Sequence, residues 1–483
     1  MSEVAEDQVV RFRELVEAER AFFDGTGLIT IARAPGRLDV MGGVADYSGS
    51  VVLEGTLAEA TFAAVQWRSG PVLRLRSLDA NEAGLETDAE VALDLLFSST
   101  GARSPAEVSA GLLADPKMRW SAYVAGCLFE LVVWGVLPMS NVSGLNILID
   151  SSVPIGAGVS SSAALEVATM SALGGHFDLE MSGLELAKLC QRVENRIAGA
   201  PCGIMDQVTS TLGREDELLA LKCQPHDVLG FARIPPGWEF VGIDSGVKHS
   251  IGGSSYSRAR VAAFMGLKIL NSLASLRPSV ERMATEDEDE DDSQRRWPVF
   301  QYLCDLGPDM WEPWRPRIPE TLTGVDFLSH FGELPDSVTR VDPDQTYSVR
   351  ACTEHPILEN DRVRQFIALM SLAGDEPDKM LLTEAGALMV DSHRSYSDRL
   401  DLGAPETDLL VELATEIGPK SGIYGAKITG GGSGGTVAVL GSGADGAIRH
   451  LLSEYARRTG IQPRVMRGSS PGAEAFGVHR LRL

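Results

Sequence analysis

The segment 156–164 combines glycine and serine in a pattern that suits the binding of an anion. It reads Gly-Ala-Gly-Val-Ser-Ser-Ser-Ala-Ala and lies between an apolar run at 145–149 and a helix-like run at 165–173. The segment is therefore expected to form a strand-to-helix turn, whose backbone conformations glycine permits. The first N–H groups of a helix lack helical partners and carry partial positive charge, which favours a phosphate there. Serine hydroxyls add donors, or a hard oxygen ligand for Mg²⁺.

An ordinary Gly/Ser loop has the same composition, so this motif alone leaves both interpretations open. The segment is not a Walker A loop, because it has no Gly-Lys-Ser/Thr, and it is not the Gly-x-Gly-x-x-Gly of a dinucleotide-binding fold. Three other parts of the chain favour an anion-binding site at this segment.

The first of these parts is 35–47, which contains Arg37, Asp39 and Asp46. Its proline and glycines predict a loop. A turn with solvated charges is one interpretation. The other is a substrate-binding lip, in which the arginine stabilises phosphoryl charge and the aspartates bind hydroxyl groups.

Two further carboxylates flank the second part, a Gly/Pro-containing break at 199–203. Glu194 lies near the end of a helix predicted at 184–198, and Asp206 lies beside Gly203 and Met205. A buried aspartate could orient or deprotonate a hydroxyl group. Pro201 separates the two acids, so they are expected to approach one site from different elements.

The third part is a glycine cluster after Lys427, with glycine at 430–432, 434 and 435. Such a cluster lets the backbone approach a ligand or another loop closely. A flexible linker is the alternative, but apolar residues on both sides argue against it.

Composition places limits on the class of protein. The chain has 483 residues, a net charge of −24, and no apolar run of the length that spans a bilayer. Two or three domains are expected. The negative charge disfavours binding to nucleic acid or an anionic membrane. A polar N-terminus and scattered cysteines suggest a cytoplasmic protein with reduced thiols.

Periodicity predicts further elements around these residues. Helices are expected at 3–24, 104–138, 258–273 and from residue 354, and strands at 29–34, 53–65, 239–247 and 437–440. The acidic run at 286–292 is expected to be a solvated loop because its like charges repel. Residues 297–349 are interpreted as an ordered, irregular insert.

Together, the segments 35–47, 154–164 and 427–435 resemble the three signature motifs of the GHMP small-molecule kinases. Segments 120–126, 200–207 and 392–395 resemble the galactokinase branch. The resemblance implies a two-domain α/β fold. Its N-terminal half, 1–235, would be like domain 2 of ribosomal protein S5, and its C-terminal half, 236–483, ferredoxin-like. ATP and a sugar would meet in the cleft between them.

The resemblance also implies site residues. Arg37 and Asp206 would be catalytic, with Asp206 as base or orienter of the anomeric hydroxyl. Ser162 and Glu194 would hold Mg²⁺. Residues matching the ATP site are Gly156, Ala157, Gly158, Val159, Ser160, Ser161, Ser162, Trp120 and Tyr123. Residues matching the sugar side are Asp39, Gly43, Val44, Asp46, Gly203, Asp206, Tyr256 and Gly431.

One difference from the galactokinase motif bears on which sugar the protein binds. Galactokinases usually read Gly-Glu-His-Thr-Asp-Tyr where this chain reads Gly-Gly-Val-Ala-Asp-Tyr at 42–47. In that family the missing Glu and His face the C6 hydroxymethyl of galactose. Gly43 and Val44 offer no polar side chain there, which would suit L-arabinose, a sugar with the same ring configuration and no C6.

Segments 37–50, 244–266 and 344–350 also resemble the L-arabinokinases, whose plant members carry an additional N-terminal glycosyltransferase-like region. We therefore expect an ATP-dependent sugar-1-kinase that makes L-arabinose 1-phosphate, as a monomer or weak homo-oligomer. A galactokinase, a uronic-acid kinase and a non-catalytic sugar sensor are the alternatives. The four residues of the catalytic and metal set argue against a sensor.

Overall fold

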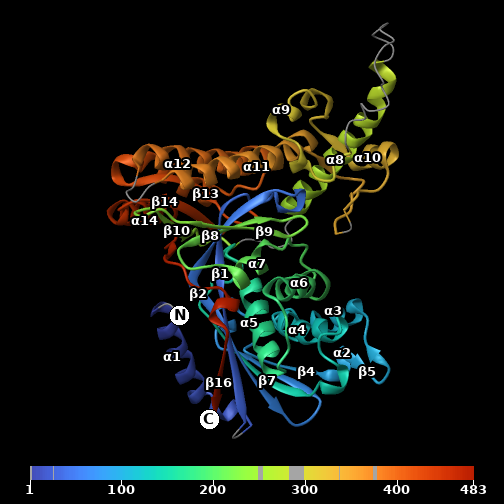
Figure 1. Cartoon of the computed structure of the whole chain (residues 1–483), viewed down its shortest axis with the longest axis vertical. Coiled ribbons are helices and arrows are strands. Elements are labelled where there is room, and N and C mark those ends of the chain that lie inside the picture. Colours follow the sequence, from blue (N-terminus) through green and yellow to red (C-terminus); the bar gives the residue numbers. More distant parts are fainter. Residues whose placement is uncertain are drawn as a thin grey trace.

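The computed structural model describes residues 3–24, 27–248, 254–281, 299–336, 338–373 and 378–482. Its larger sheet has the order β16-β1-β2-β7-β3-β4, with β8 pairing with both β2 and β9 (Figure 1). Strand β16 pairs antiparallel with β1, so the C-terminal strand returns to the N-terminal sheet. The strands are β1 (Leu28–Met41), β2 (Val51–Arg68), β3 (Val72–Ser77), β4 (Asp88–Ala92), β7 (Gly144–Ser151), β8 (Glu217–Lys222), β9 (Asp227–Arg233) and β16 (Val478–Arg482).

Strand β1 is longer than the sequence suggested, and the loop predicted from residue 35 to residue 41 is wrong. All of its residues except Leu28 are buried, and it pairs with β2 along its length. The pairing shifts register between Pro35 and Arg37, where a proline is tolerated because the ladder is interrupted. Such a bulge redirects the neighbouring side chains. Arg37 and Asp39 are therefore held on a rigid strand.

Successive side chains of β2 point to opposite faces of the larger sheet, so the apolar core around this sheet has two layers. Ala63 and Val65 face the helices α4, α5 and α6, whereas Phe62 and Ala64 face α1 on the other side of the sheet. This period of two is the one expected for a strand with both faces covered. The longer helices of this half are α1 (Glu3–Ala18), α3 (Pro105–Leu112), α4 (Ser121–Val133), α5 (Ser161–His176), α6 (Gly183–Val193) and α7 (Met205–Leu212).

Two helix predictions have informative outcomes. The helix expected over 104–138 is two helices, because α3 starts at a Ser104 capping box and ends before the loop that leads to α4. The helix expected over 184–198 is confirmed, as α6 followed by one π-helical turn at Glu194–Ala198. This turn ends at Gly199, whose φ of 76° suits glycine.

The second sheet has the order β13-β14-β10-β15. Helices α11 and α12 cover one of its faces at the top of Figure 1, and α13 and α14 pack with it through a separate apolar cluster. Among the described residues, no helix is both long enough and apolar enough to cross a membrane. The elements are β10 (Glu239–Asp244), β13 (Ile423–Ile428), β14 (Thr436–Gly441), β15 (Arg464–Met466), α11 (Val349–Leu372), α12 (Lys379–Arg394), α13 (Pro405–Ile417) and α14 (Asp445–Thr459). The domain division at residue 235 stays a prediction.

The expected insert packs against helix α8 (Ser254–Glu281). Its described part contains short elements and buries Trp311, Trp314 and Phe327 in the same apolar cluster as α8. The insert thus has an ordered core, although its elements are short. They are α9 (Pro308–Trp311), β11 (Leu322–Thr323), α10 (Gly324–Phe331) and β12 (Thr346–Tyr347). The acidic run at 286–292 lies outside the described residues.

The contact between α12 and β13 leads to a stability prediction. A Cβ added at Gly386 of α12 would lie 2.0 Å from the Tyr424 carbonyl oxygen. Gly386→Ala should therefore destabilise the protein by about 1–3 kcal/mol, although alanine is normally the better helix former. The measurement is urea denaturation followed by far-UV circular dichroism.

Gly446→Ala in α14 is the matched control. A Cβ there would meet only the end of Arg449, at 4.0 Å. This substitution should be neutral or stabilise by up to about 1 kcal/mol. Equal effects of the two substitutions would show that α12 does not pack on β13 as described.

Candidate active site

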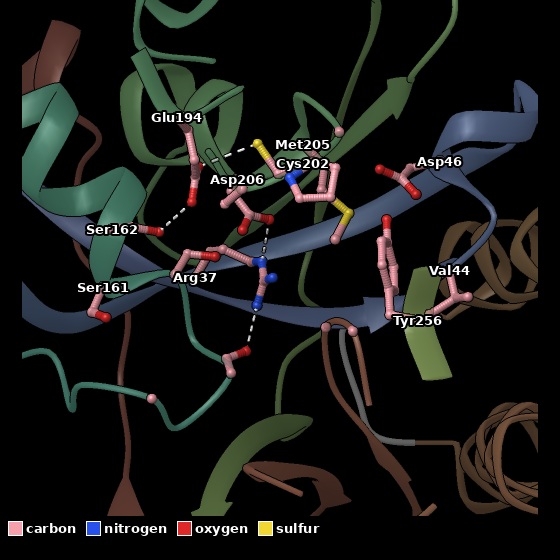
Figure 2. Close-up of a pocket in the computed structure, with 18 residues that line it drawn as sticks. Arg37, Val44, Asp46, Ser161, Ser162, Glu194, Cys202, Met205, Asp206 and Tyr256 are labelled. Atoms are coloured by element: carbon pink, nitrogen blue, oxygen red, sulfur yellow. Dashed lines mark hydrogen bonds and ion pairs between the residues drawn. The ribbon is translucent and has the colours of Figure 1, made fainter. Parts of the chain in front are cut away.

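Arg37 lies at the centre of the site, between Asp206 and the segment that contains Gly158 (Figure 2). Its Nε donates to Asp206 Oδ1 at 2.9 Å, and its Nη1 donates to the Gly158 carbonyl at 2.8 Å. Glu54 Oε2 lies 3.5 Å from the same Nε. Burial alone would lower the pKa of Arg37, but the carboxylates of Asp206, Glu54 and Asp39 raise it above its ordinary value. The guanidinium is therefore a permanent positive charge beside Asp206.

The glycine-serine segment forms the predicted strand-to-helix turn, between the end of β7 and the start of α5. Residues 156–162 are called the phosphate turn below. Ser160 caps α5 in the left-handed conformation, and no side chain caps the helix. The Ser160 Oγ is buried and has no hydrogen-bond partner among the described residues. The first turn of α5 thus offers free N–H groups and a free hydroxyl to an anion.

Ser162 and Glu194 meet beside this turn, as expected. The Ser162 hydroxyl donates to Glu194 Oε1 at 2.8 Å, and Gln207 Nε2 donates to Glu194 Oε2 at 2.6 Å. The Cys202 thiol lies 3.2 Å from the same Oε2. Burial, followed by the charge of Asp206, raises the pKa of Glu194 to about 7. The hydrogen bonds of Ser162, Cys202 and Gln207 oppose this rise.

This set of donors fits a magnesium ion. Glu166 is buried behind Glu194, and burial together with the Glu194 charge raises the pKa of Glu166 well above its ordinary value. Its Oε1 has no partner among the described residues. Close acidic groups of this kind favour a cation, and a hydroxyl with a carboxylate are hard oxygen ligands. Ser162 and Glu194 are therefore suited to hold Mg²⁺.

Asp46 and Tyr256 face each other on the opposite side of Arg37 (Figure 2). Asp46 is 2% exposed, and a Cβ at Gly203 would lie 1.6 Å from its Oδ2. Glycine at position 203 therefore makes room for the Asp46 carboxylate. Burial raises the pKa of Asp46, while the positive charge of Arg260 lowers it. Val44 lies beside them with a φ of 57°, which is unusual for a β-branched residue and typical of functional sites.

Two adjoining pockets contain most of the predicted residues. The first pocket is lined by Arg37, Val44, Asp46, Gly156, Gly158, Ser160, Ser161, Ser162, Glu194, Gly203, Asp206, Tyr256 and Gly431, among others. The second is lined by Trp120 and Tyr123, and it shares Gly156, Ser161 and Ser162 with the first. A ligand that spans both pockets would therefore pass across the phosphate turn.

Four predicted residues lie behind the walls of these pockets. Ala157 and Val159 are buried, and their carbonyl groups accept hydrogen bonds from Thr436 and from the Arg37 backbone. Asp39, expected on the sugar side, is fully buried instead and forms an ion pair with Lys427, 3.0 Å from Nζ to Oδ2. Its carboxylate cannot contact a sugar while this pair holds it inside the protein.

Gly43, also expected on the sugar side, has no space for a side chain. A Cβ there would lie 2.1 Å from Asp39 Oδ2 and 2.2 Å from the Tyr396 hydroxyl oxygen. Tyr396 is fully buried and donates to the Gly430 carbonyl at 3.2 Å. His355 Nε2 lies 3.3 Å from the Gly43 carbonyl, and burial lowers the pKa of this histidine to about 4. The 43–44 turn thus packs against three buried side chains, those of Asp39, Tyr396 and His355.

Sequence reasoning missed several of these residues. Lys248 lines the second pocket and lies near Gly156, so it adds a cation beside the phosphate turn. Its position directly after the strand predicted at 239–247 could have suggested this contact. In the sequence, Lys427 is only the start of the glycine cluster. Tyr396 directly follows the motif at 392–395, and no function was predicted for it. Their partners are distant in sequence, and no local pattern identifies such pairs.

The arrangement can hold a polyphosphate at the phosphate turn and a hydroxyl group at Asp206, which are the requirements of phosphoryl transfer. Comparison with known proteins agrees with this. Residues 123–214 match the family model described as the GHMP kinases N terminal domain. Galactokinase from Chloroflexus aggregans is 30% identical over 90% of this chain and 90% of its own. The chain therefore belongs to the GHMP kinase family, among its sugar kinases.

L-arabinokinase from Arabidopsis thaliana is 39% identical over 99% of this chain. The chain spans about half of that protein's length, with 49% covered. The crystal structure of Lactococcus lactis galactokinase with galactose superposes with a TM-score of 0.69, over 97% of this chain and 100% of its own, at 21% identity. A mevalonate kinase structure gives a TM-score of 0.52 at 16% identity over 91% of this chain. The predicted GHMP kinase fold is confirmed.

The ion pair between Arg37 and Asp206 leads to a catalytic prediction. We expect Asp206→Asn to lower kcat about 10²- to 10⁴-fold, because the amide neither accepts a proton nor carries a charge. The amide keeps the shape of the side chain but removes a charge that neutralises the buried Arg37, so the melting temperature should also fall, and rates are compared per mole of folded enzyme. ADP release in a coupled assay with ATP and sugar is the measurement.

The control for this variant is Asp361→Asn, which removes a carboxylate from helix α11 that accepts a hydrogen bond from Gln365. Its rate should equal that of the unmodified protein. A near-normal rate for Asp206→Asn would remove Asp206 from the catalytic set.

Proposed function

We propose that the protein is an ATP-dependent sugar-1-kinase that converts L-arabinose to L-arabinose 1-phosphate. The observation that carries this proposal is the placement of the Arg37–Asp206 ion pair between the phosphate turn and a pocket for a small polar ligand. Two observations favour L-arabinose over galactose. The chain is 39% identical to an L-arabinokinase, and Gly43 presents no side chain at the turn.

Asp206 would bind the anomeric hydroxyl and orient it or take its proton. The hydroxyl oxygen then forms a bond to the γ-phosphorus of ATP, the bond from that phosphorus to the β–γ bridging oxygen breaks, and ADP leaves. Arg37 would stabilise the charge on the transferring group, which is the main requirement of this reaction. Because Arg37 also binds the Gly158 carbonyl, it fixes the distance between the phosphate turn and Asp206.

The nucleotide would occupy the second pocket and the phosphate turn. Trp120 and Tyr123 line the part of this pocket suited to the adenine. The Trp120 indole N–H is already committed to the Glu86 carbonyl at 2.8 Å, so the ring would contribute apolar contact rather than a hydrogen bond. Free N–H groups of α5 and Lys248 would receive the phosphates.

Ser162 and Glu194 would hold Mg²⁺ next to these phosphates. When bound, the ion would neutralise phosphate charge. The chain's own contribution is to keep the Glu194 carboxylate in place, through the hydrogen bonds from Ser162 and Gln207. A cation at Glu194 also offsets the repulsion between Glu194 and Asp206 that raises the pKa of Glu194.

The sugar would lie between Asp206 and Asp46, near Gly203, Tyr256 and Gly431. Asp46 would accept hydrogen bonds from ring hydroxyls. Near the 43–44 turn, the space for a side chain at position 43 is filled by Asp39 and Tyr396. A C6 hydroxyl beside Gly43 and Val44 would find no donor or acceptor on those two side chains, and one left unpaired would cost about 1–3 kcal/mol. L-arabinose avoids this cost.

Galactose is the second candidate, because full-length relatives of this chain are named galactokinases. A uronic acid is less well supported. Its carboxylate would need a cation near Gly43, and Lys427, which lies in that region, is committed to Asp39.

A sugar panel tests the substrate. With ATP and Mg²⁺, we expect kcat/KM for L-arabinose to exceed that for galactose about 5- to 150-fold, the factor that corresponds to the unpaired C6 hydroxyl. Galacturonic acid serves as the uronic-acid arm. An equal or higher kcat/KM for galactose would refute the proposed specificity, and absence of ADP release with every sugar would refute the kinase.

The filled space at Gly43 predicts that the galactokinase side chain cannot simply be restored. Gly43→Glu should lower kcat/KM for L-arabinose at least about fivefold, since overpacking costs about 1–3 kcal/mol, and it should not create activity on galactose. Gly307→Glu makes the same change in charge where a Cβ meets nothing within 4 Å, so it should be silent. A Gly43→Glu enzyme that prefers galactose would disprove the packing argument.

A further inference from the structure

The insert reaches the sugar side of the site through one buried ion pair. Asp336, from the insert, accepts two hydrogen bonds from Arg260 of helix α8, at 3.0 Å from Nε and 3.1 Å from Nη2. Their side chains are 5% and 7% exposed. This is a bidentate, desolvated contact, and its geometry is among the most specific that an arginine and a carboxylate form.

The insert holds Asp336 itself firmly. The Thr339 hydroxyl donates to Asp336 Oδ2 at 2.6 Å, and the backbone N–H groups of Val338 and Thr339 donate to its carboxylate. Burial would raise the pKa of Asp336, but its hydrogen bonds to Arg260 and Thr339 lower it below the ordinary value. Asp336 is therefore a fixed negative charge.

Arg260 also contacts the segment that carries Asp46. Its guanidinium carbon lies 5.3 Å from the centre of the Tyr47 ring and 5.7 Å from that of Phe264, distances of a cation–π contact. Tyr47 is 4% exposed and follows Asp46 directly in the chain. A shift of Arg260 would thus move the 46–47 segment.

The charge of Arg260 acts on Asp46 as well. Asp46 is buried beside other acidic groups, Asp206 and Asp39, which together with burial favour its neutral form. The positive charge of Arg260 and the backbone N–H of Tyr47 act against this rise in pKa, and the pKa of Asp46 stays above its ordinary value. An ionised carboxylate accepts hydrogen bonds with both oxygens, whereas a protonated one has lost part of that capacity.

We propose that Asp336 and Arg260 are positioning residues for the sugar, which hold the 46–47 segment so that the Asp46 carboxyl group can accept hydrogen bonds from ring hydroxyls. This inference rests on the proposed placement of a sugar beside Asp46. It gives the insert a function in substrate binding: the insert supplies the carboxylate that fixes Arg260. Neither residue contacts the sugar in this proposal, and neither takes part in phosphoryl transfer.

A buried ion pair that only stabilises the fold is the competing interpretation, and such pairs often contribute little net stability. The two interpretations differ in the kinetic constant that they affect. A structural pair affects the amount of folded enzyme, whereas a positioning pair affects the KM for the sugar in enzyme that is folded.

The test is Asp336→Asn, measured with whichever sugar the unmodified enzyme phosphorylates best. We expect the KM for that sugar to rise about three- to tenfold, the effect of weakening one hydrogen bond to a charged group. The value of kcat and the KM for ATP should stay within about twofold, because Asp206 and the phosphate turn are untouched. Calorimetric titration of the sugar should show the same loss of affinity.

Glu320→Gln is the matched control. It removes the charge of another carboxylate of the insert, which pairs with Arg350 at the surface and is 79% exposed. Its KM values should equal those of the unmodified enzyme. Should Asp336→Asn fail to fold, Arg260→Lys provides the second test, because lysine keeps the charge but cannot form the bidentate contact. It should raise the sugar KM in the same way.

An unchanged sugar KM in a folded Asp336→Asn or Arg260→Lys enzyme would overturn the inference. So would an equal change in kcat and in both KM values. These outcomes are separate from the substrate assignment, because a preference for galactose over L-arabinose in the unmodified enzyme would refute the specificity and leave the Asp336 test in force.

Discussion

The buried guanidinium of Arg37 is the interaction on which the site depends. Arg37 is only 3% exposed. A charge buried to this extent must be neutralised and hydrogen-bonded, because the free energy of burying it would otherwise be prohibitive. Asp206 from α7, Glu54 from β2 and the Gly158 carbonyl of the phosphate turn meet this requirement together. Three separate elements are thereby held around one point, with β1 as the rigid support.

The same arrangement explains how an acidic protein can receive a polyanion. The net charge of −24 gives a global field that repels ATP. Locally, Arg37, Lys248 and the free N–H groups of α5 surround the turn, and the buried carboxyl group of Glu194 lies beside it. Positive groups are thus concentrated at the turn, which is what the proposed binding of ATP there requires.

Local patterns in the sequence predicted what local chemistry determines. The turn at 156–162 is confirmed because glycine, serine and flanking apolar runs are sufficient to define it. The strand through Pro35 was missed, because proline and glycine favour loops unless a long neighbouring strand such as β2 pairs with them. For the same reason, the sequence did not predict the Asp39–Lys427 ion pair or the contact of Tyr396 with Gly43.

The contacts that the sequence could not predict join distant positions. Asp39 and Lys427 are 388 residues apart, and Arg260 and Asp336 are 76 apart. Tyr396 lies in the π-helical turn that follows α12, and its buried hydroxyl group occupies the space that a side chain at position 43 would need. Only the fold reveals that the loss of a polar group at position 43 is accompanied by filling of the space.

A crystal structure of the enzyme with L-arabinose, Mg²⁺ and a non-hydrolysable ATP analogue tests the central claim most directly. We expect the anomeric oxygen within hydrogen-bond distance of the Asp206 carboxylate, the terminal phosphate beside Arg37 and the phosphate turn, and Asp46 bound to ring hydroxyls. A sugar bound away from Asp206, or a nucleotide whose phosphates do not reach the turn at 156–162, would contradict the account.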